Sequence, residues 1–129
     1  MKIRPVILCG GAGTRLWPNI KSYEAKQFID FGGWTLLGET LERIKNSLFD
    51  YPIISTNSKY LKEIKKNLKK HKIKKYKIVL EPAKKNTGPA ILTSGLIKDV
   101  PFNQPLIFLS SDHLIEKTSY LNYLIKKNV

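Results

Sequence analysis

The order of apolar segments along the chain is the feature that most constrains its fold. Short apolar runs of strand length occur at residues 4–9, 51–55, 76–80 and 105–109. Helical periodicity or helix-start signals mark the segments at 36–48, 58–70, 87–98 and 118–127. Strands that alternate with helices require right-handed crossovers, which build a mostly parallel sheet with helices on both faces. The sequence therefore predicts an α/β domain whose ligands bind at the carboxyl ends of its strands.

The first apolar run is too short to direct the chain into or across a membrane. It extends only over residues 6–9 before Gly10 and Gly11 interrupt it. The single cysteine, Cys9, lies inside this run and has no second cysteine to pair with, so we interpret it as a small buried hydrophobe. We expect one Rossmann-like cytoplasmic domain of about four strands, without a membrane partner and without thiol chemistry.

The net charge of +13 raises the question of a nucleic-acid partner. Ten of the 23 basic residues are lysines between positions 59 and 77, above an apolar stripe formed by Leu61, Ile64 and Leu68. That pattern is typical of a solvated helix face, and the run contains no arginine for bidentate recognition. The sequence argues against nucleic-acid binding, which stays as a remote alternative.

A glycine-rich turn directly follows the first predicted strand. It contains Gly10, Gly11, Ala12, Gly13, Thr14 and Arg15. Glycines permit positive φ and a close approach of backbone amides to phosphate oxygens. The turn lacks the Gly-Lys-Ser/Thr ending of a P-loop, and Leu16 stands where a dinucleotide fingerprint needs glycine or alanine. We interpret the turn, with the fork of donors on Arg15, as a triphosphate clamp. The alternative is a tight packing turn with a solvated arginine.

This turn resembles the signature loop of the sugar-phosphate nucleotidyltransferases, in which Gly-Gly-x-Gly-Thr-Arg-Leu-x-Pro follows the first strand. Here the segment reads Gly-Gly-Ala-Gly-Thr-Arg-Leu-Trp-Pro over residues 10–18, and Trp17 resembles the mannose-1-phosphate guanylyltransferase branch. The signature continues with Pro-Lys-Gln-Phe in that branch, whereas residues 25–28 read Ala-Lys-Gln-Phe. The resemblance assigns Lys26 to phosphate contact.

Two further segments resemble the same branch at the ends of later strands. Residues 81–90 match its Glu-Pro-x-x-Arg-Asn-Thr-Ala-Pro-Ala, except that Lys85 replaces arginine and Gly88 replaces the first alanine. A carboxylate accepts two hydrogen bonds at once, so Glu81 is suited to the two adjacent donors of guanine. The rest of the nucleotide site would come from Asn86, Thr87 and Gly88. The segment is also a plain helix entry, with Thr87 as its cap.

The segment after the fourth strand, residues 110–115, resembles the family's Pro-Ala-Asp-His-x-Ile, in which the aspartate holds magnesium. The resemblance makes Asp112 the Mg²⁺ ligand, where a hard cation would neutralise phosphate charge. The other interpretation of Asp112 is a turn or helix cap.

Together these matches imply transfer of GMP from GTP to mannose-1-phosphate, giving GDP-mannose and pyrophosphate. The family's catalytic domain is longer, and its sugar-binding segments and second metal-binding aspartate follow the part matched here. Residues 1–129 are therefore expected to form the N-terminal, nucleotide-binding part of a nucleotidyltransferase domain. The alternative to turnover is a truncated or split fragment that binds nucleotide or pairs with a second chain.

Overall fold

The computed structural model describes residues 1–11, 25–81, 97–98 and 100–129. Strands and helices alternate along them in the order β1 (Arg4–Cys9), η1 (Lys26–Phe28), α1 (Leu36–Arg43), β2 (Ile53–Thr56), η2 (Ser58–Tyr60), α2 (Leu61–Lys70), β3 (Lys77–Leu80), β4 (Leu106–Ser110) and α4 (Thr118–Lys127). All four predicted strands are confirmed within two residues at each end. The helix predicted at 87–98 lies almost wholly outside the described residues.

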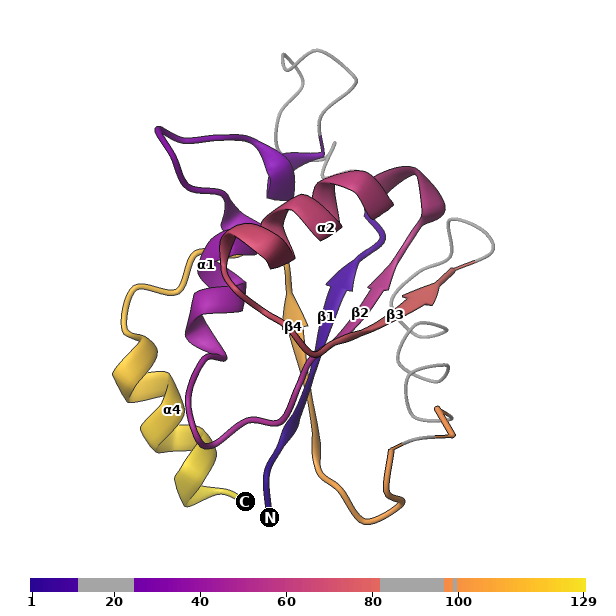
Figure 1. Ribbon diagram of the computed structural model, residues 1–129. Coiled ribbons are helices and arrows are strands. Elements are labelled where there is room, and N and C mark those ends of the chain that lie inside the picture. Colours follow the sequence, from indigo (N-terminus) through magenta and orange to yellow (C-terminus); the bar gives the residue numbers. More distant parts are fainter. Residues whose placement is uncertain (12–24, 82–96, 99) are drawn as a thin grey trace.

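The four strands form one parallel sheet in the order β3-β2-β1-β4 (Figure 1). Strand β1 lies inside the sheet and pairs with β2 on one side and β4 on the other, with Leu8 level with both Ser55 and Ser110. Because every described strand runs the same way, their carboxyl ends lie together, at the upper edge of the sheet in Figure 1. The predicted parallel α/β sheet is confirmed.

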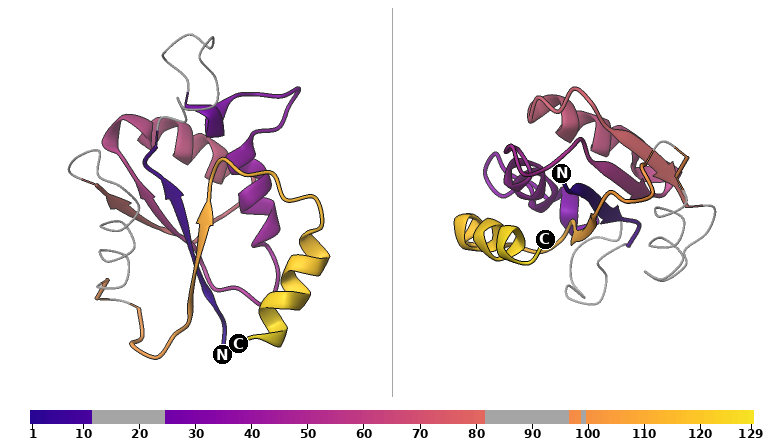
Figure 2. Two further views of the ribbon diagram at one scale, coloured as in Figure 1. Left: turned by 180° about the vertical axis from the view of Figure 1, so that it is seen from behind. Right: turned by 90° about the horizontal axis from the view of Figure 1, so that it is seen from below.

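Helices α1 and α2 lie side by side over one face of the sheet (Figures 1 and 2). Ile7 and Ile54 from the strands join Leu41 of α1 and Ile64 of α2 in one fully buried cluster. Helix α4 lies alongside α1, and Ile125 packs against this cluster. No α4 residue is buried. Among the described residues, no helix is long and apolar enough to cross a membrane.

Helix α1 is shorter than its apolar periodicity predicts. It ends at Arg43 rather than continuing to residue 48. The side-chain amide of Asn46 donates from Nδ2 to the Arg43 carbonyl at 3.2 Å, and its Oδ1 accepts from the backbone amide of Leu48 at 3.0 Å. A side chain that satisfies backbone groups in this way competes with the helical pattern and ends it. Leu48 still packs against the core, but from a turn.

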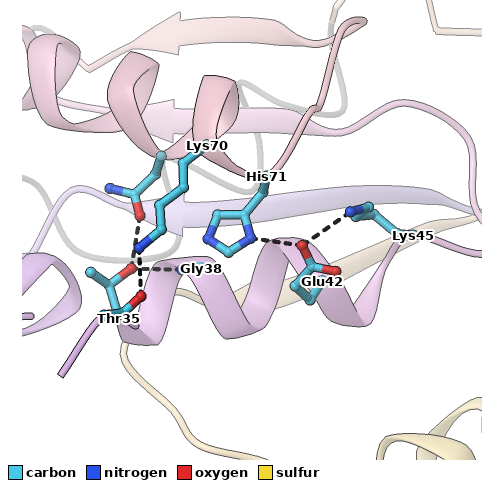
Figure 3. A network of polar contacts seen from close by, with 8 residues as sticks. Thr35, Gly38, Glu42, Lys45, Lys70 and His71 are labelled. Carbon is cyan, nitrogen blue, oxygen red and sulfur yellow. Dashed lines mark hydrogen bonds and ion pairs between the residues drawn. The ribbon is translucent and has the colours of Figure 1, made fainter. Parts of the chain in front are cut away.

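A network of polar side chains joins α1 to α2 (Figure 3). The Thr35 hydroxyl accepts from the Gly38 amide as the N-cap of α1 and donates to Oδ1 of Asn67, at 2.9 and 2.8 Å. One turn further along α1, Glu42 accepts from Nδ1 of His71 at 2.7 Å. This hydrogen bond from His71 lowers the pKa of Glu42. The two contacts fix the packing of the helices that cover the sheet.

A buried arginine lies at the opposite end of β1 from the strand carboxyl ends. The Arg4 guanidinium forms an ion pair with Asp50 at 2.8 Å and donates to the Tyr51 carbonyl and to Gln104. Burial alone would raise the pKa of Asp50, but hydrogen bonds from Gln104 and the Tyr51 amide, with the charge of Arg4, lower it. These contacts tie the start of β1 to the segments before β2 and β4.

Replacing Thr35 with alanine should lower the free energy of unfolding by about 1–2 kcal/mol, because it removes the cap of α1 and leaves Oδ1 of the buried Asn67 without its donor. Urea denaturation measures this difference. Thr35→Ser keeps the hydroxyl and should recover most of the loss. Equal destabilisation by both changes would show that the methyl group, and not the hydrogen bonds, matters at this position.

Candidate functional site

The register of the sheet brings three of the predicted site residues, Gly10, Glu81 and Asp112, to the same edge of the sheet. Side chains alternate between the two faces of a strand, so Leu8, Ser55, Val79 and Ser110, which are level across the sheet, all point away from α1 and α2. Two positions beyond three of these residues come Gly10, Glu81 and Asp112. Their contacts lie at the edge formed by the carboxyl ends of the strands. The structure thus assembles three of the predicted positions from three different strands.

The Glu81 carboxylate is held across the end of β2. The Glu81 amide continues the sheet by donating to the Thr56 carbonyl at 2.8 Å, and Oε1 accepts from the Ser55 hydroxyl at 2.7 Å. Its other oxygen, Oε2, lies against Gly10, where an added Cβ would approach it to 2.7 Å. The Glu81 carboxylate, which follows β3, therefore reaches Gly10 at the start of the glycine turn after β1.

Gly10 and Gly11 differ in the space around them. Among the described glycines, only Gly32 and Gly33 have positive φ. Gly10 needs no left-handed conformation; it needs the space that Glu81 occupies. For Gly11 a Cβ would meet no described atom within 4 Å.

The segment containing Lys26 is anchored to the glycine turn by its neighbour Gln27. The Gln27 side chain is buried, and its amide donates to the Gly11 carbonyl at 3.0 Å. This contact brings η1, and with it the half-buried Lys26, to the turn after β1. Sequence reasoning singled out Lys26 and passed over Gln27, although both belong to the same four-residue match.

Asp112 follows β4 and is partly buried, with 28% of its side chain exposed. Its Oδ1 accepts from the Ser110 hydroxyl and lies 3.6 Å from Nε2 of the exposed His113. Ser111 anchors this turn by donating its hydroxyl to the Leu8 carbonyl at 2.8 Å. Within the described ranges, no three His, Cys, Asp or Glu side chains gather as a metal cluster. A lone carboxylate fits Mg²⁺, which is commonly held by one or two carboxylates together with water and substrate phosphates.

Cys9 lies beneath this edge and takes no part in its chemistry. Burial raises the pKa of its thiol to about 12, the hydrogen bond with Ser111 opposes the rise, and the charges of Asp112 and Glu81 add to it. The thiol stays protonated at any physiological pH. The structural role predicted for Cys9 is consistent with this environment.

The remaining predicted site residues, Ala12, Gly13, Thr14 and Arg15 in the turn and Asn86, Thr87 and Gly88 after β3, lie outside the described residues. Both segments start at described residues of the assembled edge: the turn continues from Gly11, and the second segment continues from Glu81.

A parallel sheet with a glycine turn after its first strand and carboxylates directly after β3 and β4 defines a Rossmann-like protein with a ligand edge. The chain matches the sequence profile of the nucleotidyl transferase family over residues 4–128. It belongs to that family.

The relatives found by sequence include an alginate biosynthesis protein and several mannose-1-phosphate guanylyltransferases. The chain is 35% identical to the alginate biosynthesis protein AlgA of Pseudomonas fluorescens over 114 residues, which are 87% of this chain and 24% of that protein. It is also 35% identical to mannose-1-phosphate guanylyltransferase 2 of Escherichia coli O157:H7, over 94% of this chain and 26% of the relative. The chain thus spans about a quarter of the length of these relatives.

Solved structures show the same fold. A Helicobacter pylori protein described as a mannose-6-phosphate isomerase superimposes with a TM-score of 0.72 at 30% identity, covering 98% of this chain and 45% of that one. A UDP-glucose pyrophosphorylase complexed with UDP-glucose superimposes with a TM-score of 0.69 at 21% identity, covering 99% of this chain and 54% of that one. The second likeness concerns the fold alone.

Gly10→Ala should move the Glu81 carboxylate away from Ser55 and lower the free energy of unfolding by about 1–3 kcal/mol, because the buried Ser55 hydroxyl loses its acceptor. The carboxyl carbon chemical shift of Glu81 and urea denaturation measure the two effects. Gly11→Ala is the matched control and should leave the shift of Glu81 unchanged. An unchanged shift in Gly10→Ala would contradict the close packing of the two residues.

Proposed function

We propose that this chain forms the nucleotide-binding part of a transferase that moves GMP from GTP to mannose-1-phosphate, giving GDP-mannose and pyrophosphate. The observation that supports it most is the Glu81 carboxylate, held by Ser55 and set against Gly10 at the edge where this fold binds ligands. The names of the sequence relatives point to the same substrates. A cytoplasmic location fits soluble substrates of this kind.

Glu81 would read the guanine base. Guanine presents two adjacent N–H donors, and an ionised carboxylate offers two acceptor oxygens. Oε1 already accepts one hydrogen bond from Ser55 and retains a second lone pair, and Oε2 faces the glycine turn. Asn86, Thr87 and Gly88 would complete the base and ribose contacts. Adenine offers a donor and an acceptor on the same edge, so it fits this carboxylate less well.

The triphosphate would lie over the glycine turn. Amides of Gly10, Gly11, Ala12, Gly13 and Thr14 would face its oxygens, and Arg15 would supply a planar fork of donors. Lys26, brought to the turn through Gln27, would add a compact positive charge near the phosphates. These groups favour the triphosphate over a neutral ligand.

Catalysis would rest on positioning and on neutralisation of charge, with no protein nucleophile. An oxygen of the sugar phosphate attacks the α-phosphorus of GTP, the bond from that phosphorus to the bridging oxygen of pyrophosphate breaks, and the charge shifts onto the leaving group. Arg15 and Lys26 would hold that charge. Asp112 would hold Mg²⁺, which when bound neutralises phosphate oxygens.

A nucleotide-binding fragment without turnover of its own is the second candidate function. The chain spans about a quarter of the length of its curated relatives, so a second chain or a further segment would supply the remaining walls of the site. Pyrophosphate release that depends on mannose-1-phosphate separates the two functions. A nucleic-acid-binding module, the remote alternative suggested by the charge of +13, would show steep salt dependence of DNA binding and no binding of GTP.

The chain should bind GTP with magnesium more tightly than ATP, by about tenfold, because a bidentate carboxylate contact discriminates by about 1–3 kcal/mol. Isothermal titration of both nucleotides measures the ratio. Glu81→Gln should reduce it, since one acceptor becomes a donor. Equal affinity for GTP and ATP in the unmodified chain would rule out the assignment of Glu81 to the base.

Asp112→Asn should reduce the gain in GTP affinity on adding Mg²⁺ by about tenfold or more, because even a residue that only supports a metal ligand commonly contributes that much to metal affinity. Glu116→Gln removes the same charge from an exposed position of the same loop and should keep the gain. Titrations with and without magnesium provide the comparison. A gain that persists in Asp112→Asn would show that the metal is held elsewhere.

A further inference from the structure

Ser55 is a polar side chain in the buried interior of the sheet. The side chains of β2, Ile53–Thr56, are all buried, and Ser55 has no exposed surface. Ser55 is level with Leu8 and Val79 and points to the same face of the sheet. Gly10 and Glu81 follow these two residues by two positions, so Ser55 lies directly beneath them in the sheet. A buried hydroxyl in such a place needs a hydrogen-bond partner.

The partner of Ser55 is the carboxylate that we assign to the base. The Ser55 Oγ to Glu81 Oε1 distance is 2.7 Å, the usual length of a hydroxyl–carboxylate hydrogen bond. An ionised carboxylate can only accept, so the hydroxyl must be the donor. The direction of this hydrogen bond is therefore fixed.

Three contacts together leave the Glu81 carboxylate little freedom. Its backbone amide is held by the Thr56 carbonyl, Oε1 by the Ser55 hydroxyl, and Oε2 by the packing against Gly10. Rotation of the carboxyl group would lengthen the bond to Ser55 or press Oε2 further onto Gly10. Bidentate recognition depends on the plane in which the two carboxylate oxygens of Glu81 lie. The hydrogen bond from the Ser55 hydroxyl holds that plane.

We propose that Ser55 is a positioning residue that determines nucleobase selectivity by orienting Glu81 before the ligand arrives. This inference rests on the proposed function, because it presumes that Glu81 faces guanine. Ser55 is fully buried, so it would act on the nucleotide only through Glu81. Its loss should therefore reduce the preference for GTP over ATP more than it reduces the affinity for ATP.

The test compares the ratio of GTP to ATP affinity in purified variants of the 129-residue chain. Ser55→Ala should lower the ratio by about fivefold. Ser55→Thr keeps a hydroxyl and should restore much of it. Thr56→Val is the matched control: it removes the next buried hydroxyl of β2, which donates to the Cys9 carbonyl and does not touch the Glu81 side chain. This control should keep the ratio. Thermal denaturation of each variant separates lost stability from lost selectivity.

A double-mutant cycle then tests whether Ser55 acts through Glu81. In a Glu81→Gln background, Ser55→Ala should change the ratio by less than about twofold, because no fixed pair of acceptors remains to be oriented. An undiminished ratio in Ser55→Ala, or an equal loss in Thr56→Val, would overturn the inference while leaving the proposed function in place. An unmodified chain that binds GTP and ATP equally would overturn both.

Discussion

The parallel pairing of β1 with a strand on each side is the constraint on which the rest of the structure depends. It places Leu8 level with Ser55 and Ser110 and so sets the height at which each neighbouring strand ends. Because these ends coincide, Glu81 reaches Gly10 across the end of β2, and Asp112 follows β4 at the same edge of the sheet. A shift of one residue between β1 and β2 would turn Ser55 to the opposite face, into the core beneath α1 and α2, and would separate it from Glu81. The buried cluster beneath the two helices holds this register and therefore also the geometry of the ligand edge.

The sequence predicted the elements well because their signals are local. Apolar runs and periodicity identify strands and helices, and alternation predicts a parallel sheet with polar motifs at the carboxyl ends of its strands. The predicted end of α1 was wrong because the side chain of Asn46 hydrogen-bonds to backbone groups and ends the helix, although the apolar pattern continues beyond it. Glu81 and Asp112 could be predicted as site residues because they follow strands within recognisable motifs. Ser55 and Gln27 could not, because their partners are distant in sequence and a single chain does not reveal the pairing. The signal available for Ser55 was a serine within a run of apolar strand residues.

The two ends of β1 differ in how the charged side chains around them are paired. At its start, the Arg4 charge is satisfied by Asp50, Gln104 and the Tyr51 carbonyl, so the cation and its partners are paired within the protein. At its end, Glu81 and Asp112 each accept a hydrogen bond from a serine hydroxyl, and Oδ1 of Asp112 also lies 3.6 Å from Nε2 of the exposed His113. A carboxylate that accepts only neutral donors keeps its full charge for a ligand or a metal ion. The fold thus neutralises charge at one edge of the sheet and retains it at the other.

The single cysteine makes this edge open to a kind of observation that does not depend on any ligand. Cys9 is the last residue of β1, has no exposed surface and has a thiol whose pKa is raised to about 12. A thiol reagent can reach it only when the packing around the end of β1 opens, and the alkylation rate then reports the free energy of that opening. Because the chain contains no other cysteine, every labelled molecule records an opening at the same place, directly below the glycine turn. The alkylation rate of Cys9 therefore measures how often the packing at the end of β1 opens.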